Sequence, residues 1–308
     1  MIQQHIKQYV DKLQLQNYKS FYLAFLRVVM SMWLLKEVCI NWTSMEILYG
    51  NSALVVPAKN LISRLPGGGF LLVKNYYIWF ILGYVVVIFM SILGIGKWFT
   101  AMLLFGMFMV LQKMNMTMLN GGDKMAMALL LYLIFADSYQ YFTLFRQKRD
   151  KNDTHKLQNL LSNLAAFSMM LQLCLAYFQS SVAKAGNFFW LHGEATYYAL
   201  SMERFVGTAF NKYIVQYKWI DYVSNYATLS FELLFPLLIW IKKLRKPLLI
   251  TGLLFHLCIY IFLMIYGFQI VFILIYGLFL PNQQLLDFAQ KCKTFFLRKK
   301  MEVTTNTP

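Results

Sequence analysis

The chain has 308 residues, of which 59% are hydrophobic and 14% are charged, and its mean hydropathy is +0.51. This composition excludes an ordinary soluble domain, because too few polar side chains remain to cover its surface. The net charge of +16 would suit nucleic acid, but most Lys and Arg residues lie in loops between apolar segments, as membrane topology places them. We therefore predict an all-α, polytopic membrane protein that contacts the lipid bilayer and no nucleic acid.

Residues 1–19 are polar, with apolar side chains at helical spacing between lysines, which predicts a cytoplasmic helix on the inner membrane face. A single membrane domain follows over residues 20–285, and residues 286–308 form a basic cytoplasmic tail. We expect about eight spans, near 20–40, 76–96, 98–118, 124–144, 159–184, 226–241, 247–266 and 268–285. Most basic residues then face the cytoplasm, which predicts that both termini are cytoplasmic.

Arg27 lies well inside the first predicted span. An unpaired charge there costs about 2.5–3.5 kcal/mol on insertion scales. The side chain should therefore face protein and meet a carboxylate or backbone carbonyls. Both a structural ion pair and a role in a ligand site are open for this residue.

Two connections between the spans are long. The first, residues 41–75, holds two prolines and the run Gly67–Gly69, which lacks the setting of a phosphate-binding loop and predicts a plain loop. The second, residues 185–225, is rich in aromatic residues. Such rings favour the headgroup level of a bilayer, so this connection is expected to contain helices that lie in the interface.

A short turn sequence, Asn120-Gly121-Gly122-Asp123, precedes the fourth predicted span. In one interpretation Asp123 caps the following helix, because Asp is a favoured N-cap residue. In the other, the two glycines bring the backbone close to a ligand, and Asn120 and Asp123 line its pocket.

A lone lysine, Lys184, ends the fifth predicted span, and Trp190, His192 and Glu194 follow within ten residues. This sequence places a base, a proton shuttle and a carboxylate where a membrane helix meets water. A lysine at a span end often serves only as an anchor that reaches the surface. Small neighbours on both sides of Lys184 favour burial, which lowers a lysine's pKa toward a value useful for a base.

The same topology brings further polar residues toward the outer face. Asn120 and Asp123 lie at that face, and Glu232 and His256 lie inside the sixth and seventh predicted spans. Together with Trp190 and Arg27, these residues are candidates for an outward-facing ligand pocket. The alternative is a network of buried pairs that only holds the helices together.

Four stretches, in this order and spacing, resemble the membrane domain of vitamin K-dependent gamma-carboxylases, also called the horizontally transferred transmembrane domain. They are NGGD, QLCLAYFQSSVAKAGNFFWLHGEATYYAL, FELLFPLLI and GLLFHLCIYIFLMIYGFQIVFILIYGLFL. The similarity covers roughly residues 20–285. Bacterial members of the family include a branch that resembles sporulation-delaying-protein B, an export or maturation factor.

The resemblance implies a role and a cofactor for this site. In the carboxylases a lysine followed by a tryptophan is the base that deprotonates vitamin K hydroquinone, and Lys184 with Trp190 is the matching stretch. A reduced, vitamin K-like quinone is thus the implied cofactor, and no metal is predicted. Gly121 stands where the carboxylases carry histidine, and their exoplasmic substrate-binding domain has no counterpart in these residues, so glutamate carboxylation itself is not expected.

Two functions remain open. In the first, a bacterial inner-membrane protein uses the lipophilic pocket to mature or export a small secreted peptide, together with neighbouring maturation proteins. In the second, the protein is a non-enzymatic export or immunity partner with a vestigial pocket. A small-solute transporter is less favoured, because the sequence shows no paired broken spans.

Overall fold

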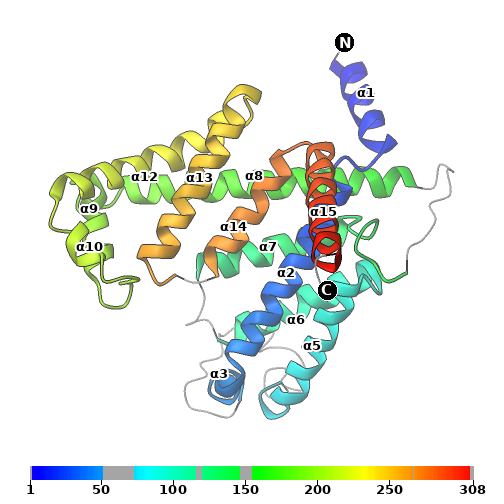
Figure 1. Ribbon diagram of the computed structural model, residues 1–308, viewed down its shortest axis with the longest axis horizontal. Coiled ribbons are helices and arrows are strands. Elements are labelled where there is room, and N and C mark those ends of the chain that lie inside the picture. The colour runs from blue at the N-terminus through cyan, green and yellow to red at the C-terminus, as the bar shows by residue number, and fades with distance from the viewer. Residues whose placement is uncertain (1, 51–72, 116–119, 146–154, 266, 306–308) are drawn as a thin grey trace.

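The computed structural model describes residues 2–50, 73–115, 120–145, 155–265 and 267–305, and within them the chain is all-helical apart from one isolated β-bridge between Val206 and Leu263 (Figure 1). The predicted all-α class is therefore confirmed. The helices are α1 (Ile2–Leu15), α2 (Ser20–Ile40), η1 (Trp42–Ser44), α3 (Met45–Tyr49), α5 (Tyr77–Leu93), α6 (Lys97–Met114), α7 (Gly121–Phe135), α8 (Lys156–Ala185), α9 (Phe188–Leu191), α10 (Ala195–Ser201), α11 (Asn211–Ile214), α12 (Lys218–Leu238), α13 (Lys242–Phe262), α14 (Phe268–Tyr276), η5 (Gly277–Phe279) and α15 (Asn282–Thr305).

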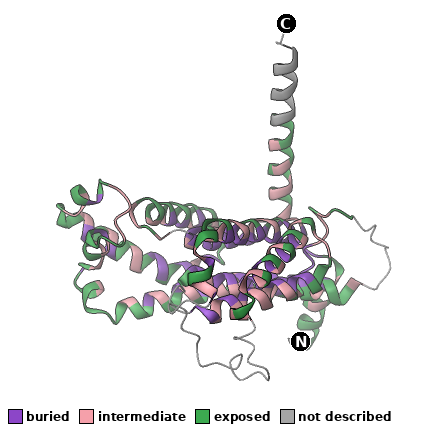
Figure 2. Cartoon of the chain, turned by 90° about the horizontal axis from the view of Figure 1, so that it is seen from below, coloured by how far each residue is buried: buried purple, intermediate pink, exposed green. Residues whose placement is uncertain are grey.

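The helices pack around the 30-residue helix α8, which contacts α1, α7, α12 and α14. Figure 1 shows α12 running beside α8, with α9 and α10 at one end of this pair and α13 beside α12. Helices α2, α5, α6 and α7 form the other part of the bundle. Figure 2 shows buried residues gathered where the helices face one another, while α15 projects away from them.

Helix boundaries follow the predicted spans closely at some ends and not at others. Helix α2 matches residues 20–40, and the turn before α6 lies at Gly96 and Lys97, both with positive φ. Helix α7 stops at Phe135 rather than near residue 144, because Asp137 and Ser138 are polar residues that leave the helix, and the Asp137 N–H bonds to Ser162 Oγ. Helix α13 begins at Lys242, so the predicted basic loop 242–246 is its first turn.

The number of candidate membrane spans is smaller than the eight predicted. Among the described residues, α8 and α13 are long and apolar enough to cross a membrane, and α14 with α15 forms a third candidate that is bent by 113°. Helices α5, α7 and α14 have 17, 15 and 9 residues, fewer than the roughly 20 that a bilayer requires. The bend follows Pro281, whose ring nitrogen cannot continue a helix.

The two predicted surface segments are also helical. Within the predicted segment 1–19, Ile2–Leu15 form α1, which docks on α8 because Asn159 and Asn163 donate hydrogen bonds to carbonyls at its end. The aromatic connection 185–225 contains the short helices α9, α10 and α11. The predicted glycine-run loop, residues 67–69, lies outside the described residues.

Arg27 is 2% exposed and meets backbone carbonyls, one of the two kinds of partner predicted for it. Its guanidinium also lies 5.0 Å from the ring centre of Tyr139. The carbonyls that accept its hydrogen bonds belong to Ser91, Ile92, Ser138, Tyr141 and Phe142. Two of them lie in the last turn of α5, where helix carbonyls lack intrahelical partners and a cation is favoured. Arg27 thus ties α2 to the end of α5 and to the segment after α7.

Replacement of Arg27 by leucine should lower stability without preventing membrane insertion, because several buried carbonyls lose their donor. We expect a loss of about 3 kcal/mol or more and a melting temperature lower by more than about 5 °C. Thermal unfolding in detergent measures this effect, with Arg204→Leu at an exposed position as the matched control. Equal melting temperatures for both variants would contradict the capping role of Arg27.

Candidate functional site

Lys184 lies in the last turn of α8 and forms an ion pair with Glu232 of α12. Its Nζ atom lies 2.5 Å from Glu232 Oε1, and the two side chains are 22% and 6% exposed. The same Nζ lies 4.7 Å from the ring centre of Trp190 on α9. Three of the predicted site residues are therefore in contact, and the pair joins two helices across 48 positions of sequence.

Two tyrosines and a histidine form a buried hydrogen-bonded cluster beside this pair. The hydroxyl of Tyr177, two turns before Lys184 on α8, lies 2.7 Å from His256 Nε2 and 2.5 Å from the Tyr276 hydroxyl. Tyr276 reaches this place because Gly252 of α13 has no side chain: a Cβ there would lie 2.3 Å from the Tyr276 hydroxyl oxygen. His256 is thus placed on the protein side of α13, as predicted.

The two clusters share an aromatic wall. Phe231, next to Glu232 on α12, lies 5.5 Å from the Tyr177 ring, measured between ring centres. Within the described part of the chain, Glu232 Oε2 and His256 Nδ1 are buried atoms without a hydrogen-bond partner. Buried polar atoms are normally satisfied, so each is a position where a ligand or a water can bind. The tyrosines Tyr177 and Tyr276 carry no signal in the sequence beyond their aromatic character.

His192 and Glu194 do not join these clusters. His192 is exposed beyond α9, and its Nδ1 donates to the Phe188 carbonyl over 2.9 Å while its ring stacks on the Phe188 ring. Glu194 is exposed and occupies the N-cap position of α10. Both side chains are exposed, and in the described part of the chain neither forms a hydrogen bond or an ion pair with Lys184 or Glu232.

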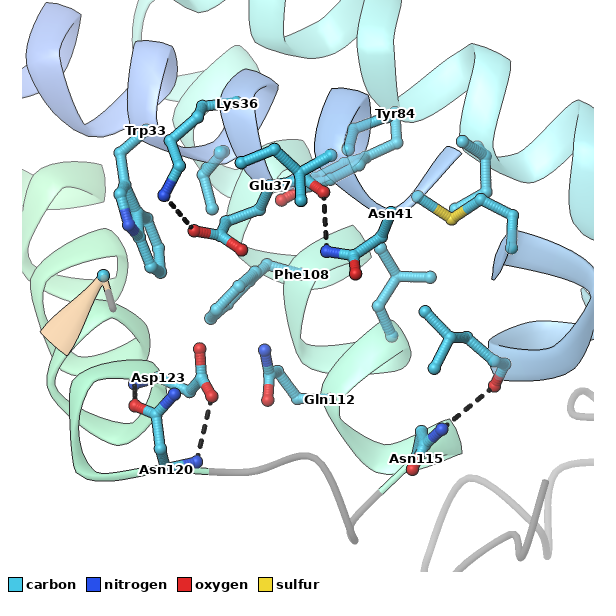
Figure 3. Close-up of a pocket in the computed structure, with 18 of the residues that line it drawn as sticks. Trp33, Lys36, Glu37, Asn41, Tyr84, Phe108, Gln112, Asn115, Asn120 and Asp123 are labelled. Atoms are coloured by element: carbon cyan, nitrogen blue, oxygen red, sulfur yellow. Dashed lines mark hydrogen bonds and ion pairs between the residues drawn. The ribbon is translucent and has the colours of Figure 1, made fainter. Parts of the chain in front are cut away.

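Asn120 and Asp123 line a separate cavity of about 640 Å³ between α2, α3, α5, α6 and α7 (Figure 3). They also form a capping box, in which Asn120 Oδ1 accepts from the N–H groups of Gly122 and Asp123, and Asp123 Oδ2 accepts from the Asn120 N–H. The N-cap is therefore Asn120 and not Asp123, which is the third residue of the helix and completes the capping box. The second interpretation holds in so far as both side chains line a cavity, although the two glycines lie against Phe268.

Helix α2 supplies the opposite wall of the cavity. Figure 3 shows Glu37 and Asp123 pointing into the same space from opposite sides, with Phe108 and Gln112 of α6 between them. Burial, and secondarily the charge of Glu37, raises the pKa of Asp123, while the Asn120 N–H opposes this shift. Trp33 and Glu37 were not predicted as site residues, although the charges of Lys36 and Glu37 inside an apolar run are a signal for such a site.

Phe268 separates the cavity from the His256 cluster. A Cβ on Gly122 would lie 2.8 Å from Phe268 Cα, so the glycines bring the start of α7 against the start of α14. The Phe268 ring lies 5.8 Å from the His256 ring, between centres. Arg27 is engaged elsewhere, by carbonyls. The predicted single pocket is therefore divided. Asn120 and Asp123 line the cavity, Lys184, Trp190, Glu232 and His256 lie at the second site, and Arg27 makes a structural contact.

Replacement of Tyr177 by phenylalanine tests the buried cluster. His256 Nε2 would lose its partner, and the free energy of unfolding should fall by about 1–3 kcal/mol. Thermal unfolding with Tyr213→Phe as an exposed control measures this. Unchanged stability would mean that the hydroxyl makes no stabilising hydrogen bond.

Comparison of the chain with protein-family models, with curated proteins and with solved structures finds no match.

Proposed function

We propose that this protein is a multi-pass bacterial inner-membrane protein of the gamma-carboxylase-like family. In this proposal Lys184 takes a proton from a lipophilic ligand during the maturation or export of a small secreted peptide. The observation that carries the proposal is the contact of Lys184 with Glu232 and Trp190, because it joins a base, a proton acceptor and an aromatic surface at one helix end. The order of the sequence stretches quoted above supports the family.

The ion pair gives Lys184 a route to its neutral form. Transfer of one proton from the Lys184 ammonium to the Glu232 carboxylate, across 2.5 Å, leaves an amine and a carboxylic acid. The amine then accepts the proton of a ligand hydroxyl, which leaves a ligand oxyanion beside the re-formed ammonium. Proton transfer of this kind by a positioned side chain contributes roughly 10²–10⁴-fold to a rate.

A reduced quinone is the ligand implied by the resemblance, and the residues present fit such a group. Glu232 Oε2 is a buried atom that lacks a partner among the described residues, so once Glu232 holds the proton this side chain can donate a hydrogen bond to the ligand oxygen while the hydroxyl faces Lys184. Trp190, against the Lys184 ammonium, and Phe231, against the Tyr177 ring, offer aromatic surface near this pair. When bound, the quinol supplies a phenolic hydroxyl of the acidity that a lysine can deprotonate.

The pair itself favours a second candidate, a non-enzymatic export or immunity partner. Helices α8 and α12 pack along each other, and Glu232 is a buried carboxylate that requires a cation. Lys184 satisfies that requirement without any chemistry. In this case the contact holds the two helices together, and the proton stays on the lysine.

Substitution of Lys184 separates the two candidates. Lys184→Arg keeps the positive charge and the pair with Glu232, but a guanidinium does not deprotonate near neutral pH. The variant should therefore keep its thermal stability and lose peptide maturation. Lys184→Ala should lose both, since an unpaired buried carboxylate costs about 3–5 kcal/mol.

Mass spectrometry of secreted peptides compares cells that carry each variant with cells that lack the protein. Lys212→Arg, at an exposed lysine in the aromatic connection that follows α8, is the matched control and should leave the peptides unchanged. Wild-type peptides from the Lys184→Arg variant would end the enzymatic proposal and support the non-enzymatic partner.

The proposed topology, with both termini in the cytoplasm, has its own test. In a variant whose four native cysteines are replaced by alanine, a membrane-impermeant maleimide on intact cells should label Tyr197→Cys and not Asp150→Cys. The reason is that the basic segment around residue 150 is expected inside and the aromatic connection outside. Labelling at position 150 in intact cells would overturn this orientation.

A further inference from the structure

The cavity between α2, α5, α6 and α7 has the size and the lining of a ligand site. Its volume of about 640 Å³ lies within the range of small-molecule pockets, roughly 300–1,000 Å³. Aromatic rings of Trp33, Tyr84 and Phe108 line it beside amide side chains. It contains neither Lys184 nor Glu232, so the proposed proton transfer does not account for it.

The charge of the lining favours a cation. Glu37 and Asp123 point into the space from α2 and α7 (Figure 3), and Lys36 is the single basic residue among the described lining residues. Lys36 Nζ lies 2.9 Å from Glu37 Oε1, and both side chains are more than a third exposed. A pair of this exposure contributes little. Among the described residues Asp123 forms no ion pair, and its carboxylate accepts from the Asn120 N–H.

A second observation points to a ligand in the same place. Trp33 is 5% exposed, and its Nε1 is a buried donor without a hydrogen-bond partner in the described part of the chain. The backbone of Gly267, which also lines the cavity, lies close to this nitrogen. A Cβ on Gly267 would lie 3.2 Å from Trp33 Nε1 and 3.3 Å from Glu37 Oε1. An unpartnered donor and a carboxylate oxygen therefore lie near each other in the cavity lining, and a ligand with both an oxygen and a cationic group can satisfy them together.

We infer that this cavity binds an organic ammonium ion of the arylalkylamine class. The ammonium group lies between Glu37 and Asp123, the aromatic body lies against Phe108 and Tyr84, and an oxygen of the ligand accepts from Trp33 Nε1. Aromatic walls attract a cation through their electron-rich faces. A divalent cation such as Ca²⁺ or Mg²⁺ would instead require about six oxygen ligands drawn closely together, and the described residues contain no group of three or more His, Cys, Asp or Glu side chains that could hold a metal ion.

Three probes with one aromatic body and different head groups test this inference by isothermal titration calorimetry on the full-length protein in detergent. Tyramine carries an ammonium, 4-ethylphenol carries no charged group, and 3-(4-hydroxyphenyl)propionate carries a carboxylate. We expect tyramine to bind at least tenfold more tightly than the other two. Equal affinities, or no heat from tyramine at millimolar concentration, would overturn the proposal.

Variants assign the binding to this cavity. Asp123→Asn, which keeps an oxygen for the Asn120 N–H, and Glu37→Gln should each weaken tyramine at least tenfold. Trp33→Phe keeps the ring, removes the donor, and should weaken all phenolic probes several-fold. Glu46→Gln on α3 removes one exposed carboxylate outside the lining and should leave tyramine affinity unchanged.

Lys184→Arg should also leave tyramine affinity unchanged, which keeps this inference separate from the proton-transfer proposal. Wild-type tyramine affinity in both carboxylate variants would place the amine elsewhere and refute the inference.

Discussion

The packing of α2, α5 and the segment after α7 depends on the hydrogen bonds of Arg27. A guanidinium buried among apolar helices must be satisfied, and five carbonyls from two separate segments converge on it. This convergence requires α5 to end beside α2, and it requires the chain after α7 to fold back beneath α5. Hydrogen bonding between Leu144 and Leu93 continues that return. The cavity walls made by α2, α5, α6 and α7 are held in place by this contact.

The other half is organised by polar groups along the contact of α8 with α12. Asn225 of α12 donates to the Trp190 carbonyl, and Glu232, two turns further, meets Lys184. The Asn225 bond fixes α9, which sets the indole of Trp190 against the Lys184 ammonium. Helix α12 therefore supplies both the carboxylate that pairs with Lys184 and, through Asn225, the hydrogen bond that positions Trp190. Burial of an ion pair carries a large desolvation penalty. Because the pair is retained despite that penalty, a functional role is as compatible with it as a structural one.

Phe268 and the glycines of α7 decide how these halves meet. Gly122 allows α7 to approach α14 so closely that no side chain fits between them, and the Phe268 ring then fills the space toward His256. One predicted pocket becomes an acidic, aromatic cavity on one side and a proton-bearing cluster on the other. The two sites differ in charge: the described lining of the cavity has two carboxylates and one lysine, whereas at the other site one lysine pairs with one carboxylate.

Composition and local pattern alone determined the all-α class, the position of α2 and the turn at Gly96, because helix propensity and glycine conformation act over a few residues. They also indicated a capped helix start after residue 120, although they assigned the N-cap to Asp123 and not to Asn120. They also singled out Lys184 and Trp190, which lie close together at the end of an apolar segment, and Glu232, which lies inside one, where an ionisable side chain needs a partner. Only the tertiary structure decided that Lys184 pairs with Glu232, that Tyr177 and Tyr276 accompany His256, and that Trp33 and Glu37 face Asp123. These residues are far apart in sequence, and the close packing of α7 on α14 and of α8 on α12 selects which of many compatible polar groups meet. The helix ends that differed from the predicted spans did so for the same reason, since hydrogen bonds to distant residues, such as that of Asp137 to Ser162, stop a helix where apolar composition alone would continue it.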